Sequence, residues 1–343
     1  MNRDHKLPTI SIVIATYNSM RTIEECLSSI CIQDYPKEKI EIVVADGGST
    51  DGTLEVAQKF GASVYKIDTA KQNAEYNKSV GISHAKHELV AMIDHDNILP
   101  HATWFRHMVR PFVEQREVVA AETLRFTYDP RGALLDRYFA LFGSGDPIVW
   151  YLGKTDRLSY MFDRYTLAGK VIKHHPYYVV RFTENNMPTI GANGFLVRRT
   201  ILMKYANVKP GTYYDMDINI DLIRHGYDTF AFVPDGIVHK TGYGSIWYYF
   251  TRRILFMSQY HVGKQGNRRF HMVSKVNLWR LVLSVVFCIT LVVPFLEALR
   301  GWMKIRDRAW FLHPVMGLGF VSIYTWVIMR HSLTNYGRKI LGT

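Results

Sequence analysis

Hydrophobic positions in the first 125 residues alternate between short continuous runs and runs with helical spacing. The continuous runs predict buried strands, at 9–15 (TISIVIA), 41–46 (EIVVAD), 62–67 (ASVYKI), 88–94 (ELVAMID) and 118–124 (VVAAETL). The spaced runs predict helices over 20–32, between Asp51 and Gly61, and over 72–85. Strands that alternate with helices indicate an α/β fold, a mostly parallel sheet with helices on both faces.

The pattern changes after residue 126. Residues 127–188 are aromatic and without clear periodicity, so we expect an irregular insertion that covers the ligand site of the sheet. Strand character returns at 189–199 and 229–234, with a helix predicted over 215–226. The stretch 245–260 (SIWYYFTRRILFMSQY) predicts an aromatic, basic helix. We therefore expect one domain over 1–245, which includes the insertion, and a helical region over 246–343.

Two long apolar runs, 281–296 and 309–329, dominate that helical region. The second is long enough to span a bilayer and the first is marginal without its flanks. Basic residues flank both runs, so positive charge does not decide their topology. A membrane hairpin, an interfacial pair and soluble core helices all stay open. If the runs are membrane segments, a cut near residue 275 should release a soluble domain.

Polar side chains gather where the predicted strands end. The first strand leads into Thr16, Tyr17 and Asn18, the second ends at Asp46, and the fourth runs into Asp94-His95-Asp96. Ligands of such sheets bind outside the carboxyl ends of the strands. Asp94 and Asp96 are close in sequence and repel each other, so they need a proton, a cation or open solvent. Their position predicts a ligand and a metal ion there.

Charge and cysteine content narrow the partners. The formal net charge is +12, and the basic segments 263–275 (GKQGNRRFHMVSK) and 300–308 (RGWMKIRDR) flank the apolar runs. This placement favours membrane phosphates over a nucleic acid polymer, and no zinc-finger or RNP-like motif is present. Three cysteines do not make a disulfide framework. The apolar run at 9–15, near the N-terminus, is too short for a signal peptide. We therefore expect the α/β domain, and any catalytic site in it, on the cytoplasmic side of the cell membrane.

The order of several short motifs resembles the family 2 glycosyltransferases, which have the GT-A fold. They are SIVIATYN (11–18), VADGGSTDGT (44–53), NAEYNKSVG (73–81), MIDHDN (92–97), YDMDINIDLIRHGY (214–227), VHKTG (238–242) and WYYFTRR (247–253). The resemblance covers roughly residues 8–255. The chain departs from it at Tyr214, where the family usually has Glu, at Asp221, where a helix Arg is common, and in ATY, which replaces P-T-Y.

The resemblance implies roles for individual residues. Asp96 is the first choice as a ligand for Mg²⁺ or Mn²⁺; Asp94 would position the ribose or the metal, and His239 would be a further ligand or a diphosphate contact. Asp215 would be the general base, with Asp217 as the alternative. The remaining donor-binding candidates are Thr16, Tyr17, Asn18, Asp46, Asn77, Arg252 and Arg253.

Simpler roles compete with each of these. Asp94 and Asp96 would be a solvated turn, Asp46 a turn residue, and Tyr17 a packing residue. Asp215 would be a helix N-cap, His239 a structural histidine, and the two arginines part of a solvated helix face.

We expect a membrane-associated, metal-dependent, inverting glycosyltransferase that moves a sugar from a nucleotide-sugar donor to a hydroxyl acceptor. The acceptor would belong to a cell-surface polysaccharide or a lipid-linked glycan. A sugar-phosphate nucleotidyltransferase is a weaker alternative, because ATYNSMRT (15–22) lacks the glycines of its phosphate loop. A catalytically inactive membrane scaffold that binds nucleotide-sugar is another, which the intact aspartates disfavour.

Overall fold

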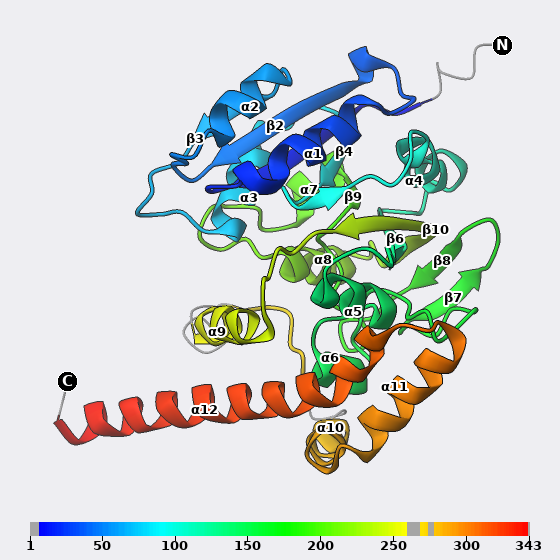
Figure 1. Ribbon diagram of the computed structural model, residues 1–343. Coiled ribbons are helices and arrows are strands. Elements are labelled where there is room, and N and C mark those ends of the chain that lie inside the picture. The colour runs from blue at the N-terminus through cyan, green and yellow to red at the C-terminus, as the bar shows by residue number, and fades with distance from the viewer. Residues whose placement is uncertain (1–6, 259–267, 274–277, 342–343) are drawn as a thin grey trace. The chain divides into compact units, whose positions relative to one another are not determined.

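The computed structural model describes residues 7–258, 268–273 and 278–341, with side chains described up to residue 333. Parts of the basic segment 263–275 lie outside the described residues. The chain forms two compact units, coloured by residue number in Figure 1. Unit 1 comprises Met1–Thr127, Asp156–Leu158 and Tyr165–Lys240, and unit 2 comprises Tyr128–Thr155, Ser159–Arg164 and Thr241–Thr343.

Unit 1 is an α/β unit built on one sheet. Its strands are β1 (Ile10–Thr16), β2 (Ile40–Asp46), β3 (Ser63–Lys66), β4 (Leu89–Met92), β5 (Asn97–Ile98), β6 (Ala120–Phe126), β7 (Lys170–Lys173), β8 (Tyr178–Arg181), β9 (Phe195–Arg198) and β10 (Thr229–His239). Its helices are α1 (Met20–Cys31), α2 (Thr53–Lys59), α3 (Ala74–His84), α4 (Trp104–Glu114), α7 (Arg199–Tyr205) and α8 (Asp215–Arg224), with a short 3₁₀ helix η2 (Lys37–Lys39).

The strand order is β3-β2-β1-β4-β9-β6-β10-β8-β7, and β5 pairs with β10. The half formed by β3, β2, β1 and β4 is parallel, as the alternating pattern predicted. The other half is mixed, because β9 runs antiparallel to both β4 and β6, and β8 runs antiparallel to β10. The fold class is confirmed, with a sheet that is mixed as a whole. The C-terminal half carries the antiparallel strands that periodicity alone did not distinguish.

Strand β1 shows why these residues form the centre of the sheet. All seven of its residues are buried, and β-branched Ile and Val suit a strand with neighbours on both faces. Helix α3 packs on β1 and β2, and Gly81 makes this possible because a Cβ there would lie 2.5 Å from a methyl group of Val13. In the register of the parallel strands, Thr16 lies opposite Asp46. The polar ends of β1 and β2 therefore meet at one edge, as predicted.

The insertion over 127–188 is more regular than expected. It contains α5 (Leu134–Phe142) and α6 (Pro147–Tyr151), which belong to unit 2, and strands β7 and β8, which belong to unit 1. The prediction of an irregular segment was wrong here: its aromatic stretches form helices that pack on other helices of unit 2. Their apolar residues are too densely spaced to give a clear period.

Unit 2 is helical. Besides α5 and α6 it contains α9 (Ile246–Phe256), α10 (Leu278–Thr290), α11 (Val292–Lys304), η6 (Arg308–Phe311) and α12 (Leu312–Leu341). Its core joins α5 to the C-terminal helices; Phe142, for example, meets Trp310 edge to face at 4.8 Å between ring centroids. Helix α12 contributes a stripe at helical spacing, Met316, Phe320, Ile323 and Val327.

Only part of this helical surface is buried. Residues 308–333 form one helical stretch that is long and apolar enough to cross a membrane. Its 18-residue apolar window has a mean hydropathy of 1.5, and 33% of that window is buried within the chain. The first apolar run is not one straight helix: α10 and α11 meet at an angle of 77° around Leu291, which has φ +62°. Together these two helices would count as a second, broken span.

Candidate functional site

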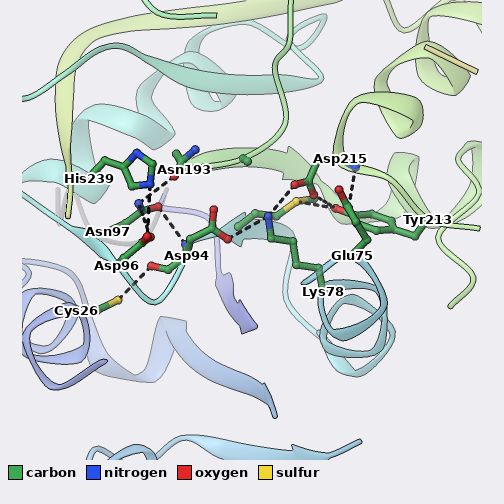
Figure 2. A network of polar contacts seen from close by, with 12 residues as sticks. Cys26, Glu75, Lys78, Asp94, Asp96, Asn97, Asn193, Tyr213, Asp215 and His239 are labelled. Carbon is green, nitrogen blue, oxygen red and sulfur yellow. Dashed lines mark hydrogen bonds and ion pairs between the residues drawn. The ribbon is translucent and has the colours of Figure 1, made fainter. Parts of the chain in front are cut away.

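Asp96 and His239 lie side by side because β5 pairs antiparallel with the end of β10, with Asn97 opposite His239. Asp96 Oδ2 is 3.4 Å from His239 Nε2 (Figure 2), and the two side chains are 17% and 22% exposed. Burial favours the protonated carboxyl, but the neighbouring His239 outweighs it and holds the pKa of Asp96 below its usual range. Asp96 is therefore an ionised oxygen donor beside an imidazole nitrogen.

Asp94 turns to a different partner. Lys78, on α3, places its Nζ 3.0 Å from Asp94 Oδ1 and 2.7 Å from Asp215 Oδ2 (Figure 2). Lys78 is almost fully buried, and although burial favours the neutral amine, the two carboxylates raise its pKa above the usual range. The repulsion expected between Asp94 and Asp96 is thus relieved by separate partners, a lysine for one and a histidine for the other.

Asp215 is the first residue of α8, where the positive end of the helix dipole favours a carboxylate. Its Oδ1 accepts a hydrogen bond of 2.6 Å from the Tyr213 hydroxyl, and its backbone N–H donates to Glu75. Burial raises the pKa of Asp215, Lys78 opposes that shift, and Asp94 adds to it. A carboxyl with a raised pKa is a better proton acceptor than an ordinary aspartate.

Hydrogen bonds join the end of β1 to the end of β2 and to the turn that follows β2. Asp46 is fully buried, and its carboxylate accepts hydrogen bonds from Thr16 Oγ1 (2.7 Å), from Ser49 Oγ and from the backbone N–H groups of Gly48 and Ser49. These four donors give Asp46 the turn role that competed with donor binding. Its contact with a nucleotide stays a prediction.

The neighbours of Asp46 differ in what they leave accessible. Asn18 has φ +50° and bonds across to Ser49 and Thr50, which joins the two strand ends. Tyr17 is 42% exposed, so its ring is available for a ligand. Asn77 is buried and donates to the backbone oxygen of Thr16, while its Oδ1 has no hydrogen-bond partner among the described residues. Such an atom is an available acceptor beside the strand ends.

The glycine-rich turn at 191–194 is tied to the aspartate segment. Asn97 donates to Asn193 Oδ1 at 3.0 Å, and the same Asn97 accepts from the backbone N–H of Asp94. Asn193 has φ +55°. Gly191 lies so close to α8 that a Cβ on it would stand 2.3 Å from the backbone oxygen of Asp215. The turn therefore links the Asp94–Asn97 segment to the start of α8.

Sequence reasoning missed two cations near these groups. Lys78 directly follows the candidate Asn77, and a lysine in the middle of a helix that packs on two buried strands was the available clue. Arg157 is fully buried and bonds Glu122 (2.7 Å), Asp156 (2.8 Å) and the backbone oxygen of Asn193 (2.9 Å). Arg157 lies in an aperiodic stretch, so no sequence pattern indicated its role.

Arg252 and Arg253 belong to α9 of unit 2. Arg253 is within reach of Asp146 Oδ2 and of the Tyr324 hydroxyl, both at 3.2 Å and both in unit 2. Arg252 is exposed. A role for either arginine at a diphosphate stays a prediction.

The donor atoms at this site fit a hard divalent cation. Asp96 and His239 supply one oxygen and one nitrogen, and among the described residues no third His, Cys, Asp or Glu side chain converges on them. Mg²⁺ is held by one or two carboxylates together with substrate phosphates and water, so Asp96 suits it, and the His239 nitrogen is the less typical ligand of the two. Asp94, bonded to Lys78, is a neighbour of this pair rather than its partner.

Comparisons with known proteins agree on one family. The model of Glycosyl transferase family 2 matches residues 11–202. Glycosyltransferase AglE of Haloferax volcanii is 31% identical over 136 residues, 38% of this chain and 44% of that protein. GalNAc(5)-diNAcBac-PP-undecaprenol beta-1,3-glucosyltransferase of Campylobacter jejuni is 31% identical over 98 residues, 27% of this chain and 31% of that protein. The chain thus matches less than half the length of these relatives.

A solved structure has a similar fold over most of the chain. The mannosyltransferase PcManGT from Pyrobaculum calidifontis, in complex with GDP-Man and Mn²⁺, superposes with a TM-score of 0.54. The match covers 94% of this chain and 87% of the mannosyltransferase chain, at 17% sequence identity. At this identity the likeness concerns the fold.

Proposed function

Because the chain belongs to Glycosyl transferase family 2, we propose that it transfers a sugar from a nucleotide-sugar to a hydroxyl acceptor, with inversion at the anomeric carbon. The arrangement of Asp96 beside His239, with Asp94 and Asp215 joined by Lys78, carries this proposal. Of the residues in these proposed roles, Asp96 follows β4, His239 ends β10, and Asp215 begins α8.

The reaction is a single displacement. The acceptor oxygen forms a bond to the anomeric carbon as the bond from that carbon to the donor phosphate oxygen breaks. The electron pair of the broken bond leaves with the nucleoside diphosphate, and the acceptor proton passes to a carboxylate oxygen of Asp215. Burial raises the pKa of Asp215 and so strengthens it as a proton acceptor, while Lys78 keeps it ionised before the reaction.

Asp96 and His239 would hold Mg²⁺ or Mn²⁺. When bound, such a cation neutralises the charge that develops on the departing diphosphate. The solved mannosyltransferase binds Mn²⁺ together with GDP-Man, which supports the same class of cofactor and donor here. Thr16, Tyr17, Asn18, Asp46 and Asn77 would line the nucleotide, with Asp94 near the ribose. Arg252 and Arg253 would reach phosphate groups.

The acceptor is a glycan in cell-surface polysaccharide synthesis or one carried on a lipid. The name of the Campylobacter relative specifies an undecaprenol-linked acceptor. The apolar stretch 308–333 supports a membrane location, from which a lipid-linked acceptor is reached. The catalytic unit would then lie on the cytoplasmic side, where nucleotide-sugars are made.

Donor binding is the direct test. A panel of nucleotide-sugars is titrated calorimetrically onto the full chain in detergent, once with Mn²⁺ and once with excess chelator. We expect one donor class to bind only with the cation, and Asp96→Asn to lose most of that binding while the fold persists. Donor turnover that is unaffected by chelator would exclude metal dependence.

An inactive scaffold gives a different result in the same system. It would bind nucleotide-sugar but release no nucleoside diphosphate, either with acceptor or by slow hydrolysis. Release that depends on Asp215 separates the transferase from the scaffold.

A further inference from the structure

Two histidines and an aspartate converge at the far end of the β5–β10 pair, away from Asp96 and His239. His101 Nε2 is 3.0 Å from Asp235 Oδ2, and His107 Nδ1 is 2.9 Å from the same oxygen. Asp235 lies on β10 four residues before His239, which is about 13 Å along a strand. Among the described residues, this is the one group of three His, Cys, Asp or Glu side chains whose donor atoms come this close together.

The backbone around this group is fixed before any ligand binds. Gln33 Nε2 donates to the backbone oxygen of His101 at 2.9 Å, and Trp104 Nε1 donates to that of Gly236 at 2.8 Å. The backbone N–H of Gly236 donates to Asp235 Oδ1 at 2.7 Å, at the point where the register between β10 and β6 shifts. These bonds hold the end of β5, the start of α4 and the bulge of β10 together.

Each side chain has a geometry that suits a metal ligand. Thr103 Oγ1 is 3.1 Å from His101 Nδ1, so it can accept that N–H and leave Nε2 as the ligand atom. The Asp235 side chain is 9% exposed, whereas those of His101 and His107 are 39% and 52% exposed. An ion could therefore enter from solvent over the histidines and rest on a carboxylate that the fold already positions.

The donor set differs from that of Asp96 and His239. Two imidazole nitrogens and one carboxylate oxygen suit zinc, with water in the fourth position of a tetrahedron. Ligand atoms of a tetrahedral zinc site lie about 3.3 Å apart, so the distances of 2.9 and 3.0 Å need only a small adjustment. Mg²⁺ prefers oxygen ligands in an octahedron and is a poor fit.

We propose that His101, His107 and Asp235 form a second cation site, selective for Zn²⁺ over Mg²⁺. The bound ion joins α4 to the bulge of β10 and so stabilises the β5–β10 pair that carries Asp96 and His239. Its role is structural, because the site is separate from the candidate catalytic pair. The simpler alternative is that the two histidines only donate hydrogen bonds to Asp235.

Co²⁺ binding distinguishes a metal site from two histidines that only donate hydrogen bonds to Asp235. Co²⁺ in a tetrahedral site absorbs visible light strongly, whereas hydrated Co²⁺ on a protein surface absorbs weakly. The full chain in detergent is freed of metal, saturated with Mg²⁺ and titrated with Co²⁺. We expect a strong band that saturates at one ion per chain and disappears when Zn²⁺ is added in equimolar amount. Zn²⁺ should also raise the thermal unfolding midpoint in Mg²⁺ buffer.

Single substitutions test whether the ion binds at His101, His107 and Asp235. His107→Gln should weaken Co²⁺ binding at least tenfold and remove the thermal shift, whereas Asp96→Asn and the exposed His84→Gln should leave both unchanged. A band absent from the wild-type chain, a weak band typical of octahedral Co²⁺, or a full band in His107→Gln would each overturn the proposal. These readouts require no transferase activity and do not depend on the proposed function.

Discussion

At the scale of single residues, the candidate site depends on how its buried charges are paired. Asp94, Asp96 and Asp215 bring three carboxylates near one another, and Lys78 is a buried cation that bonds two of them. Removing one partner of a buried ion pair leaves the other without compensation, which costs more than the pair gains. Lys78 therefore opposes the rise that burial causes in the pKa of Asp215, the residue proposed to take the acceptor proton.

Lys78→Met should change the pH dependence of transfer. Lys78 lowers the pKa of Asp215 against the effect of burial, so its loss raises that pKa further and leaves Asp215 protonated at higher pH. We expect the acid limb of the kcat profile to be displaced to higher pH, with lower activity along that limb. Lys78→Arg keeps the charge and should shift the limb less. Identical profiles for wild type and Lys78→Met, with donor binding retained, would contradict this.

Asp215→Asn keeps the size of the side chain and removes the base. We expect turnover to fall about 10²–10⁴-fold, as for the loss of a general base, with little change in the affinity for donor. Asp217, two residues further along α8, projects from another side of the helix and is completely buried, so Asp217→Asn should affect turnover less. Single-turnover rates and donor titrations of both variants decide the matter. The reverse order would assign the base to Asp217.

At the scale of elements, the candidate site depends on close backbone approaches as much as on side chains. The turn 191–194 meets the first turn of α8 at Gly191, which has φ +133° and no room for a Cβ. This contact lets the turn reach both Asp215 and, through Asn193 and Asn97, the segment that carries Asp94.

Gly191→Ala should push that turn away from α8. The backbone conformation alone would cost about 1–3 kcal/mol for a residue with a Cβ, and the contact with the Asp215 backbone adds to it. We expect a lower urea midpoint and a lower kcat. Gly211→Ala is the matched control, since Gly211 has φ +87° but no atom within 4 Å of its Cβ position. It should show the conformational cost without the loss of kcat; equal effects on kcat in both variants would refute the role of this contact.

The elements also show which parts of the fold and of the candidate site could be predicted from the sequence. The buried runs of β1, β2 and β4 and the acidic residues that follow the last two were predictable, because short apolar runs that contain β-branched residues favour a buried strand over a helix. The partner of each aspartate was not predictable. Lys78 is 16 residues before Asp94 and 137 before Asp215, and only the packing of α3 on β1 and β2 brings the three together. Likewise, the pairing of β5 with β10 places His239 beside Asp96, and a two-residue strand leaves no periodic pattern.

At the scale of the whole molecule, the chain combines a unit that carries the candidate chemistry with a helical unit whose outer surface is apolar. On α12, the stripe from Met316 to Val327 packs into the core of unit 2. Large apolar side chains cover other positions and are 45–68% exposed; they are Val315, Leu318, Trp326, Ile328, Met329 and Leu333. An exposed apolar surface of this kind marks contact with lipid or with another protein.

The structure changes one expectation about truncation. The sequence suggested that a cut near residue 275 would release a soluble domain. The core of unit 2, however, is shared between α5 and the helices after that point, including Cys288, Trp310 and Phe320. Removing them would expose Leu135, Tyr138 and Phe142, so we expect the truncated chain to aggregate. Truncation therefore cannot test membrane binding.

A surface variant can test it, because the exposed residues of α12 are not part of that core. The full chain should sediment with liposomes that contain anionic lipid and should stay bound in 1 M salt, a concentration at which electrostatic attachment is screened. Replacing Trp326, Ile328 and Met329 by Ser removes apolar surface that is 53–57% exposed, and it should shift the chain to the supernatant without lowering the unfolding midpoint. The matched control replaces Ile32 and Val113 of unit 1, which are 65% and 46% exposed, and should not change sedimentation. If the unmodified chain remains in the supernatant without detergent, α12 is not a membrane helix and its apolar face must be covered by protein instead.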